Sequence, residues 1–426
     1  MKSFFLNIWS ITIAIIILLL IGIWLLINKN IFAVENALIK KYPTLNKKFD
    51  GNLLSSKSLI KNLENNYNVK FLPKTQFTNI NFKKIKINFE KHIEKNFSGT
   101  FFIELENSNI WLIEGKGNIF KTKIKDLLKL QNNEKLNITR IESDLNDVKI
   151  LDAYLHEENL YIYFSEIIDG CKTINISSSP INKGKLKFKK VFDSNECQKN
   201  EIQLGRLTHY IHNGVPGLLV ATNFFVRDEP QQYLSQDDNS VFGKILFFDF
   251  DNFKKILFSK GHRAPQGLYA ENNLILSTEH GPKGGDEINK IVFGENYGWP
   301  IASYGDYYME KDTTSSDKYS DKPFYLKNHE KNGFKEPIYA YVPSIGISEI
   351  IRLPNNFSNH FIDNFLIASL NGKSIFRIKF DENYNKILFS EKIFIGDRIR
   401  DIKYHNETKT ILLGLEYDGE MGILEK

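Results

Sequence analysis

The stretch NFLIASLNGKSIFRIKFD, residues 364–381, decides the fold of this 426-residue chain. It contains two runs rich in β-branched and aromatic residues, separated and bounded by Asn, Gly and Asp, which is the usual punctuation of β-strands. Five other stretches repeat this pattern without repeating its letters: NIWLIEGKGNIFKTKI (109–124), NLYIYFSEIIDGCKTINIS (159–177), GLLVATNFF (217–225) with FGKILFFDFD (242–251), NLILSTEHGPKGGDEINKIVFG (273–294) and TILLGLEYDGEMGILEK (410–426).

The six units follow one another at intervals of about 45 to 60 residues, apart from one interval widened by an insertion near residues 300–335. Repeats of this length predict the blades of a β-propeller rather than a series of Ig-like domains. No long helical period competes with the strand pattern. We therefore expect an all-β fold, a single six-bladed β-propeller over residues 97–426.

An apolar run over residues 8–27 precedes the repeats and contains no charged residue. Roughly twenty helical residues cross a hydrocarbon core of about 30 Å, and Trp9 and Trp24 stand near the ends of the run, where aromatic anchors occur. We expect a single transmembrane helix as an anchor over residues 1–30 and a basic linker over 31–96. A cleaved signal peptide is the alternative.

The net charge of +5 is unevenly distributed. Residues 28–94 carry 13 lysines against 5 acidic residues, so the rest of the chain is mildly acidic. This distribution gives no support to nucleic-acid binding. The two cysteines, Cys171 and Cys197, are separated by a hairpin-length stretch, as expected for a disulfide in an oxidising compartment, with two unpaired buried thiols as the alternative.

Four loop motifs stand out among the repeats: GHRAPQGL (261–268), EHGPKGGDEINKIVFGENYGWP (279–300), PSIGIS (343–348) and RIRDI (398–402). As a set, they resemble the soluble glucose dehydrogenase, aldose sugar dehydrogenase and sorbosone dehydrogenase family. Members of that family are six-bladed propellers that hold pyrroloquinoline quinone (PQQ) and calcium. The resemblance covers about residues 97–426.

The residue types in these motifs suit PQQ, which has three carboxylates and an electrophilic ortho-quinone. Arg263, Arg398 and Arg400 can supply bidentate guanidinium contacts to carboxylates, with surface ion pairs as the alternative. Gln266 can donate and accept hydrogen bonds beside them. The resemblance implies cofactor-contacting positions for four further residues, namely Gln236, Ser344, Asn371 and Glu416.

Calcium prefers oxygen ligands, and the glycine-rich loop 281–285 can turn its carbonyl groups toward a metal ion. The resemblance implies that the carbonyls of Gly281 and Pro282 coordinate the catalytic ion. Asp286 and Glu287 are expected to hold the loop or a second ion, with the capping of a turn as the alternative.

The stretch IQLGRL, residues 202–207, departs from the family at a catalytic position. Ile202 stands where the resemblance implies a histidine that acts as general base. An aliphatic side chain cannot accept a proton, and loss of a general base typically lowers the rate roughly 10²- to 10⁴-fold. His209 and His212 are candidate substitutes, with a structural role as the alternative, so the catalytic base stays unassigned.

Other departures point in the same direction. Ala264 replaces the usual Asn of the first motif, Asn371 falls where the family has Lys, and Glu416 replaces an Asp. These differences favour one alternative function, a catalytically lapsed propeller that binds a carbohydrate or protein partner through the same loop face. A purely structural scaffold is the third possibility.

The leading hypothesis is a PQQ- and Ca²⁺-dependent dehydrogenase that oxidises the anomeric carbon of an aldose and passes electrons to a respiratory acceptor. The resemblance places it at a bacterial inner membrane, single-pass, with the propeller on the periplasmic side. The lysines that follow the apolar run favour the opposite orientation, but long domains translocate largely regardless of charge.

Overall fold

The computed structural model describes residues 80–89, 99–145, 148–182, 184–198, 202, 205–224, 233–306, 325–416 and 418–426. All of them lie in the unit Leu72–Lys426. The expected anchor, with its apolar run 8–27, lies outside the described residues. Within the described part of the chain, no helix combines the length and the hydropathy needed to cross a membrane.

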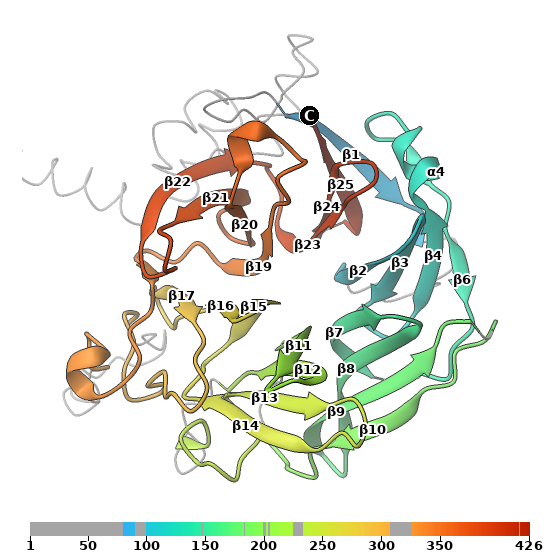
Figure 1. Cartoon of the computed structure of the whole chain (residues 1–426). Helices are drawn as coiled ribbons and strands as arrows, with labels where there is room; N and C mark the ends of the chain where they lie inside the picture. The colour runs from blue at the N-terminus through green and yellow to red at the C-terminus, as the bar shows by residue number, and fades with distance from the viewer. Residues whose placement is uncertain are drawn as a thin grey trace, which may run out of the picture. The chain divides into compact units, whose positions relative to one another are not determined.

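The strands form six sheets arranged around a common centre, which confirms the predicted six-bladed propeller (Figure 1). The first sheet contains β2 (Phe101–Glu106), β3 (Asn109–Glu114), β4 (Ile119–Lys123) and β6 (Thr139–Ile141). The second contains β7 (Lys149–His156), β8 (Asn159–Ile168), β9 (Cys171–Pro180) and β10 (Lys189–Asp193). The third contains β11 (Gly205–His212), β12 (Val215–Thr222), β13 (Lys244–Asp249) and β14 (Lys255–Lys260).

The fourth sheet contains β15 (Pro265–Glu271), β16 (Leu274–Glu279), β17 (Asp286–Lys290) and β18 (Tyr339–Tyr341). The fifth contains β19 (Ile347–Arg352), β20 (Asn364–Ser369), β21 (Ser374–Phe380) and β22 (Ile387–Phe394). The sixth contains β23 (Ile399–His405), β24 (Thr410–Leu415), β25 (Glu420–Glu425), β1 (Asn81–Ile87) and β5 (Lys135–Leu136). The described helices are short: α4 (Ile124–Leu128), η5 (Glu330–Asn332) and η6 (Asn359–Phe361).

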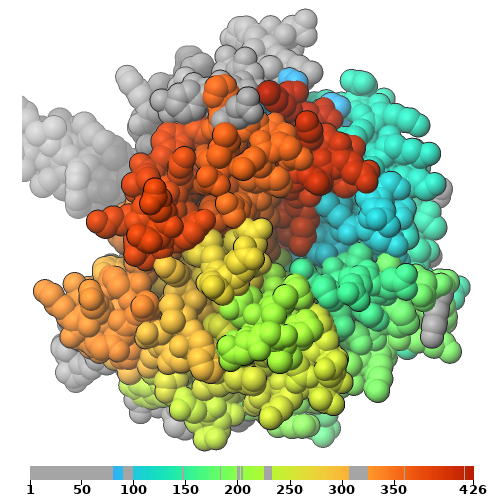
Figure 2. Space-filling model, viewed as in Figure 1, coloured from blue at the N-terminus to red at the C-terminus, as the bar shows by residue number. Residues whose placement is uncertain are grey.

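The ring is closed by strands from both ends of the described chain. β1 pairs antiparallel with β25, from Asn81 opposite Glu425 to Lys86 opposite Glu420, and parallel with β5. The space-filling view shows this N-terminal strand beside the C-terminal strands (Figure 2). The structure therefore adds β1 to the expected propeller range, 97–426, because closure of the ring covers an edge that would otherwise be exposed.

Tight hairpins explain the turn residues that punctuate the repeats. β8 and β9 are joined through Asp169 and Gly170, and β11 and β12 through Asn213 and Gly214, all with positive φ. Two such residues in succession make the type I′ turn, whose twist matches that of the flanking strands.

Apolar packing between neighbouring sheets forms the core. Trp111 of the first sheet packs with Ile162 and Phe164 of the second, and similar clusters fill the spaces between other sheets. β24 is buried at every position, whereas the outer strand β22 alternates between more exposed and less exposed residues. The inner strands are buried on both faces, so their apolar runs are nearly continuous.

The first strand of each of five sheets, together with β23, lines the centre, and each contacts its two neighbours around the ring. Several of these strands have a register shift close to their start, at Pro265/Gly267 in β15 and Ile399/Asp401 in β23. Such a bulge re-aims a side chain and disrupts the ladder locally. The residues within these two bulges are Gln266 and Arg400.

A disulfide joins Cys171 and Cys197, as one of the two sequence alternatives predicted. It ties the start of β9 to the segment that leads to the third sheet. Glu196, next to the bridge, accepts hydrogen bonds from Ser240 Oγ (2.6 Å) and Val241 N (2.7 Å), which fixes this segment to the third sheet as well.

Candidate functional site

Two of the predicted cofactor arginines lie together beside one carboxylate. Glu416 Oε2 accepts a hydrogen bond from Arg398 Nε (2.9 Å), and Glu416 Oε1 accepts one from Arg400 Nη2 (2.8 Å). Arg400 Nη1 donates to Gln266 Oε1 at 3.0 Å. Four residues that the sequence marked separately thus form one connected group at the starts of β15 and β23 and just after β24.

The electrostatics of this group follow from its burial. Burial alone would raise the pKa of Glu416, but the guanidinium groups of Arg400 and Arg398 outweigh it and hold that pKa below its usual value. Burial lowers the pKa of Arg400, against the effect of Glu416. The group therefore keeps two positive charges and one negative charge, and the excess positive charge suits an anionic ligand.

Arg263 approaches the same face from the loop before β15. Its guanidinium carbon lies 5.1 Å from the centre of the Trp299 ring, and Nη1 donates to the carbonyl oxygen of His280 at 2.9 Å. The indole face attracts a guanidinium and holds it in one orientation.

His280 interacts with Arg263 through its carbonyl oxygen and with Arg400 through the charge of the guanidinium. Burial lowers the pKa of its imidazole, and the charges of Arg400 and Arg263 add to that effect against Asp286. Its Nε2 is buried and has no hydrogen-bond partner among the described residues. Arg400 Nε is likewise buried without a partner there.

The glycine-rich loop is held in place by Asp286. Its Oδ1 accepts from Gly281 N (3.2 Å) and Ser344 Oγ (2.8 Å), and its Oδ2 accepts from the backbone N of Ile345 and of Ile347, both at 3.0 Å. These bonds join the second and third predicted motifs. Of the two roles expected for Asp286, this geometry is that of a residue that holds the loop.

Close approach of backbone atoms explains why glycine occupies position 281. A Cβ atom there would lie 2.2 Å from the carbonyl oxygens of both Gly284 and Gly285. The loop thus gathers backbone carbonyl groups in a small volume, and carbonyl oxygens are suitable ligands for calcium.

Asp286 and Glu287 are the two carboxylates that follow the glycine-rich loop in the chain. Among the described residues, no group of three or more His, Cys, Asp and Glu side chains could hold a metal ion. Burial raises the pKa of Glu287 to about 8, and the charge of Glu279 adds to that effect. The loop also offers the backbone carbonyls of Gly281 and Pro282 as oxygen donors.

The other predicted cofactor residues lie around the arginines and the glycine-rich loop. Gln236 Nε2 donates to the carbonyl oxygen of Trp299 at 2.6 Å, so Gln236 supports the ring under Arg263. Ser344 contacts Asp286 as described. Asn371 is exposed, and its backbone packs closely against Gly346 in the segment that Asp286 holds.

Ile202, which stands where the family resemblance implies a catalytic histidine, has apolar surroundings. Ile202 is 1 % exposed and packs in a cluster with residues such as Phe224 and Phe242. His209 and His212 lie further along β11, about 10 and 20 Å from Arg206 at the rise of an extended strand. His209 stacks on His156, with ring centres 4.5 Å apart. Neither histidine joins the predicted site residues.

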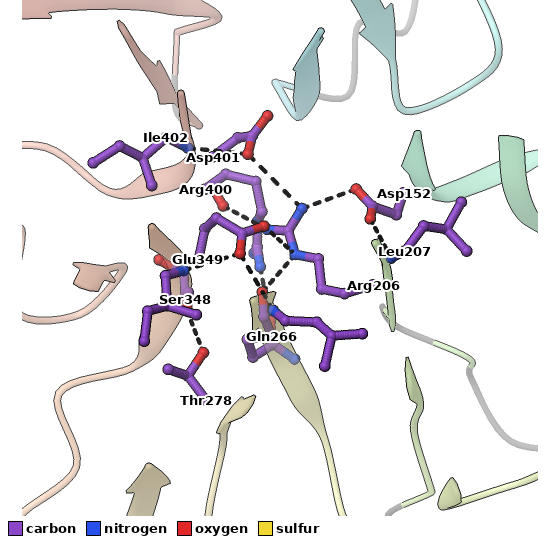
Figure 3. A network of polar contacts seen from close by, with 12 residues as sticks. Asp152, Arg206, Leu207, Gln266, Thr278, Ser348, Glu349, Arg400, Asp401 and Ile402 are labelled. Carbon is purple, nitrogen blue, oxygen red and sulfur yellow. Dashed lines mark hydrogen bonds and ion pairs between the residues drawn. The ribbon is translucent and has the colours of Figure 1, made fainter. Parts of the chain in front are cut away.

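A charged cluster at the centre of the ring was not foreseen from the sequence. Figure 3 shows Arg206 surrounded by Asp152, Glu349 and Asp401, which come from β7, β19 and β23. Burial would lower the pKa of Arg206, but these carboxylates raise it. One sequence feature could have revealed this cluster, namely a charged residue in each otherwise apolar inner strand, as in ILDAYL, GRL, ISEII and IRDI.

The fold and this geometry define a class of protein, a six-bladed β-propeller with a basic, partly buried group of side chains at the starts of its innermost strands. Comparison with known families assigns the chain to one of them. The model of the Glucose / Sorbosone dehydrogenase family matches residues 93–423, and the chain belongs to that family.

Relatives of known sequence are distant. The chain is 24% identical over 303 residues to the aldose sugar dehydrogenase YliI of Escherichia coli, which covers 66% of this chain and 76% of that protein. It is 26% identical over 211 residues to a Synechocystis protein, "Uncharacterized protein slr1608", covering 47% of this chain and 48% of that one. The chain thus spans about half the length of that relative.

Solved structures share the fold. The soluble aldose sugar dehydrogenase of Escherichia coli in its apo form superposes with a TM-score of 0.61 at 18% identity, over 81% of this chain and 99% of that one. The PQQ-bound aldose sugar dehydrogenase of Streptomyces coelicolor gives a TM-score of 0.51 at 18% identity, over 78% of this chain and 94% of that one.

Proposed function

We propose that this chain is a PQQ-dependent oxidoreductase that acts on a sugar. The observation that carries the proposal is the pair of buried, unpartnered polar atoms, Arg400 Nε and His280 Nε2, beside Arg263 and Arg398. A buried polar group without a partner costs about 1 to 3 kcal/mol, and a bound ligand removes that cost. A multiply charged, planar anion supplies acceptors to the guanidinium groups here, and PQQ is such an anion.

The residues of this chain would bind and orient the cofactor. Arg398 and Arg400, held by Glu416, would contact its carboxylates, with Gln266 beside them and Arg263 positioned by Trp299. When bound, PQQ supplies an ortho-quinone that accepts a hydride from the sugar. The role of the protein is to fix that quinone relative to the substrate and to balance its negative charge.

We extend the proposal to calcium and to the anomeric carbon of an aldose. The carbonyls of Gly281 and Pro282, in a loop that Asp286 holds, would coordinate the ion together with cofactor oxygens. Ile202 cannot take the proton of the anomeric hydroxyl, so we expect a turnover rate roughly 10²- to 10⁴-fold below that of an enzyme with a histidine there.

The apolar surroundings of Ile202 favour a second candidate function. In this alternative, the chain binds a carbohydrate or protein partner on the same face without oxidising it. The two functions differ in one measurable property, the reduction of bound PQQ by a sugar.

Calorimetric titration of PQQ into the purified full-length chain, with and without calcium, tests the proposal. We expect binding that calcium strengthens and that the substitution Arg400→Gln weakens about tenfold or more. Arg352→Gln is the matched control, because Arg352 forms its ion pairs with Glu271 and Asp363, away from this site.

Dye reduction with a panel of aldoses then separates the two candidate functions. Sugar-driven reduction supports the oxidoreductase, and PQQ binding without any reduction supports the lapsed propeller. Absence of PQQ binding by the wild-type chain contradicts the oxidoreductase and leaves the lapsed propeller.

We also propose that the apolar run 8–27 anchors the chain in a bacterial inner membrane, with the propeller on the periplasmic side and a respiratory electron acceptor. The disulfide between Cys171 and Cys197 supports an oxidising compartment. Protease treatment of spheroplasts is a direct test. Digestion of the propeller from outside supports this orientation, and protection contradicts it.

A further inference from the structure

The guanidinium group of Arg206 connects four strands besides its own at the centre of the propeller. Arg206 is 3% exposed, and its Nη1 donates to Asp152 Oδ1 at 2.9 Å. Its Nε lies 3.0 Å from Glu349 Oε2 and also donates to the carbonyl oxygen of Gln266 at 2.5 Å. Its Nη2 donates to the carbonyl oxygen of Arg400 at 2.9 Å.

The two carbonyl groups belong to residues of the proposed cofactor site. Gln266 and Arg400 are the bulge residues of β15 and β23, and their side chains meet at 3.0 Å. A bulge leaves its extra residue outside the regular ladder, so its backbone needs another partner. Arg206 provides that partner for both residues at once (Figure 3).

The carboxylates around Arg206 fix its orientation. Asp152 accepts from both the Arg206 guanidinium and the backbone N of Leu207, so it is bound to β11 at two points. Glu349 contacts the opposite side of the guanidinium. A planar guanidinium with donors in a fixed fork can serve all these acceptors simultaneously, which a lysine ammonium cannot.

Stability alone is a weak reason for this arrangement. Removing charges from water is costly, and a buried ion pair is often no better for stability than apolar side chains of similar volume. A cluster that sets the backbone positions of Gln266 and Arg400 has a further effect, since it fixes the direction from which their side chains reach a ligand.

We infer that Arg206 is a positioning residue of the proposed cofactor site, acting through the backbone of Gln266 and Arg400. This inference rests on the proposed function. Arg206 thereby affects PQQ affinity and the environment of the bound quinone without touching the cofactor.

The test variant is Arg206→Lys, which keeps the positive charge but loses the fork. We expect the full-length variant to bind PQQ roughly 10- to 100-fold more weakly, as found when groups that orient binding residues are altered. We also expect a shifted absorption spectrum of the bound quinone, because the residues around it are no longer held in the same positions.

The matched control is Arg377→Lys. Arg377 on β21 is likewise buried, at 1% exposed, pairs with Glu391 at 2.9 Å and lies over the rings of Phe361 and Phe389, in a different sheet from Gln266 and Arg400. We expect this variant to lower the melting temperature about as much as Arg206→Lys while leaving the PQQ affinity and spectrum unchanged.

All titrations are made well below the melting temperatures, so that folded protein is compared with folded protein. If Arg206→Lys is too unstable to purify, Asp152→Asn gives the same comparison, because it loosens Arg206 while both carbonyl contacts remain available. Unchanged affinity and spectrum in a folded Arg206 or Asp152 variant overturn the inference. Failure of the wild-type chain to bind PQQ overturns the proposed function instead, so the two failures are distinguishable.

Discussion

The glycine-rich loop, which joins β16 and β17, and the central charged cluster on the innermost strands are built in different ways. The loop is one continuous segment, and a single residue, Asp286, fixes it to the motif that follows. The cluster around Arg206 and Arg400 draws on five strands that are far apart in the chain. Backbone sterics therefore shape the loop, whereas pairing of buried charges shapes the cluster.

The substitution Gly281→Ala should break the loop and leave the cluster intact. Because the new Cβ would lie 2.2 Å from two carbonyl oxygens, the backbone has to move, and we expect a loss of about 3 kcal/mol in the free energy of unfolding. The calcium dependence that we propose for PQQ binding should also disappear, as measured by calorimetry.

Gly414→Ala is the control for this prediction. At Gly414 the nearest atoms to an added Cβ are 3.4 Å away, an ordinary contact distance, so we expect little change in either measurement. Equal effects of the two substitutions would show that sterics at position 281 are not what shapes the loop.

The substitution Asp286→Asn should separate the loop from the segment 343–348. An amide retains one accepting oxygen, so hydrogen bonds at the other oxygen position are lost, at a cost of about 2 to 3 kcal/mol in chemical denaturation. Ser344→Ala removes only one of the four donors and should cost about 1 kcal/mol. A smaller loss for Asp286→Asn than for Ser344→Ala would contradict the central role of Asp286.

A carboxyl close to the charged centre should make the stability of the protein depend on pH. Burial raises the pKa of Glu104 to about 7, although Lys403 lies 2.7 Å away. A folded-state pKa above the unfolded value means that this contribution to stability is complete below about pH 4.3 and is lost as the pH rises to about 7. We expect Glu104 to account for about 3 kcal/mol of decline across this range, and Glu104→Gln to remove it.

Glu106 on the same strand provides the comparison of opposite sign. Burial would raise its pKa, but hydrogen bonds from Lys121 and Trp111 lower it overall. Its contribution to stability is therefore present above the unfolded-state pKa of about 4.3 and is lost as the pH falls below that value. Glu106→Gln should therefore lower the free energy of unfolding at pH 5 to 7, and its difference from the wild-type chain should shrink as the pH falls below about 4.3. A difference that stays the same in acid would contradict the assignment.

Much of the fold was predictable because it depends on local patterns. Runs of apolar residues, bounded by turns such as Asp169–Gly170, indicated strands, and their recurrence indicated six blades. The closing strand β1 was not predicted, because pairing between Asn81–Ile87 and the C-terminal strand β25 joins opposite ends of the propeller sequence and leaves no local signal.

The site shows the same division. The sequence by itself determined the loop residues Gly281 and Asp286 and the arginines in the motifs, because local motifs specify chemical type and spacing. Only the tertiary structure decided that Glu416 lies between Arg398 and Arg400, and that Arg206 bonds to the backbone of Gln266 and Arg400. The physical reason is that ion pairs and bulge contacts depend on distances in space, which residues far apart in the chain acquire only when the ring closes.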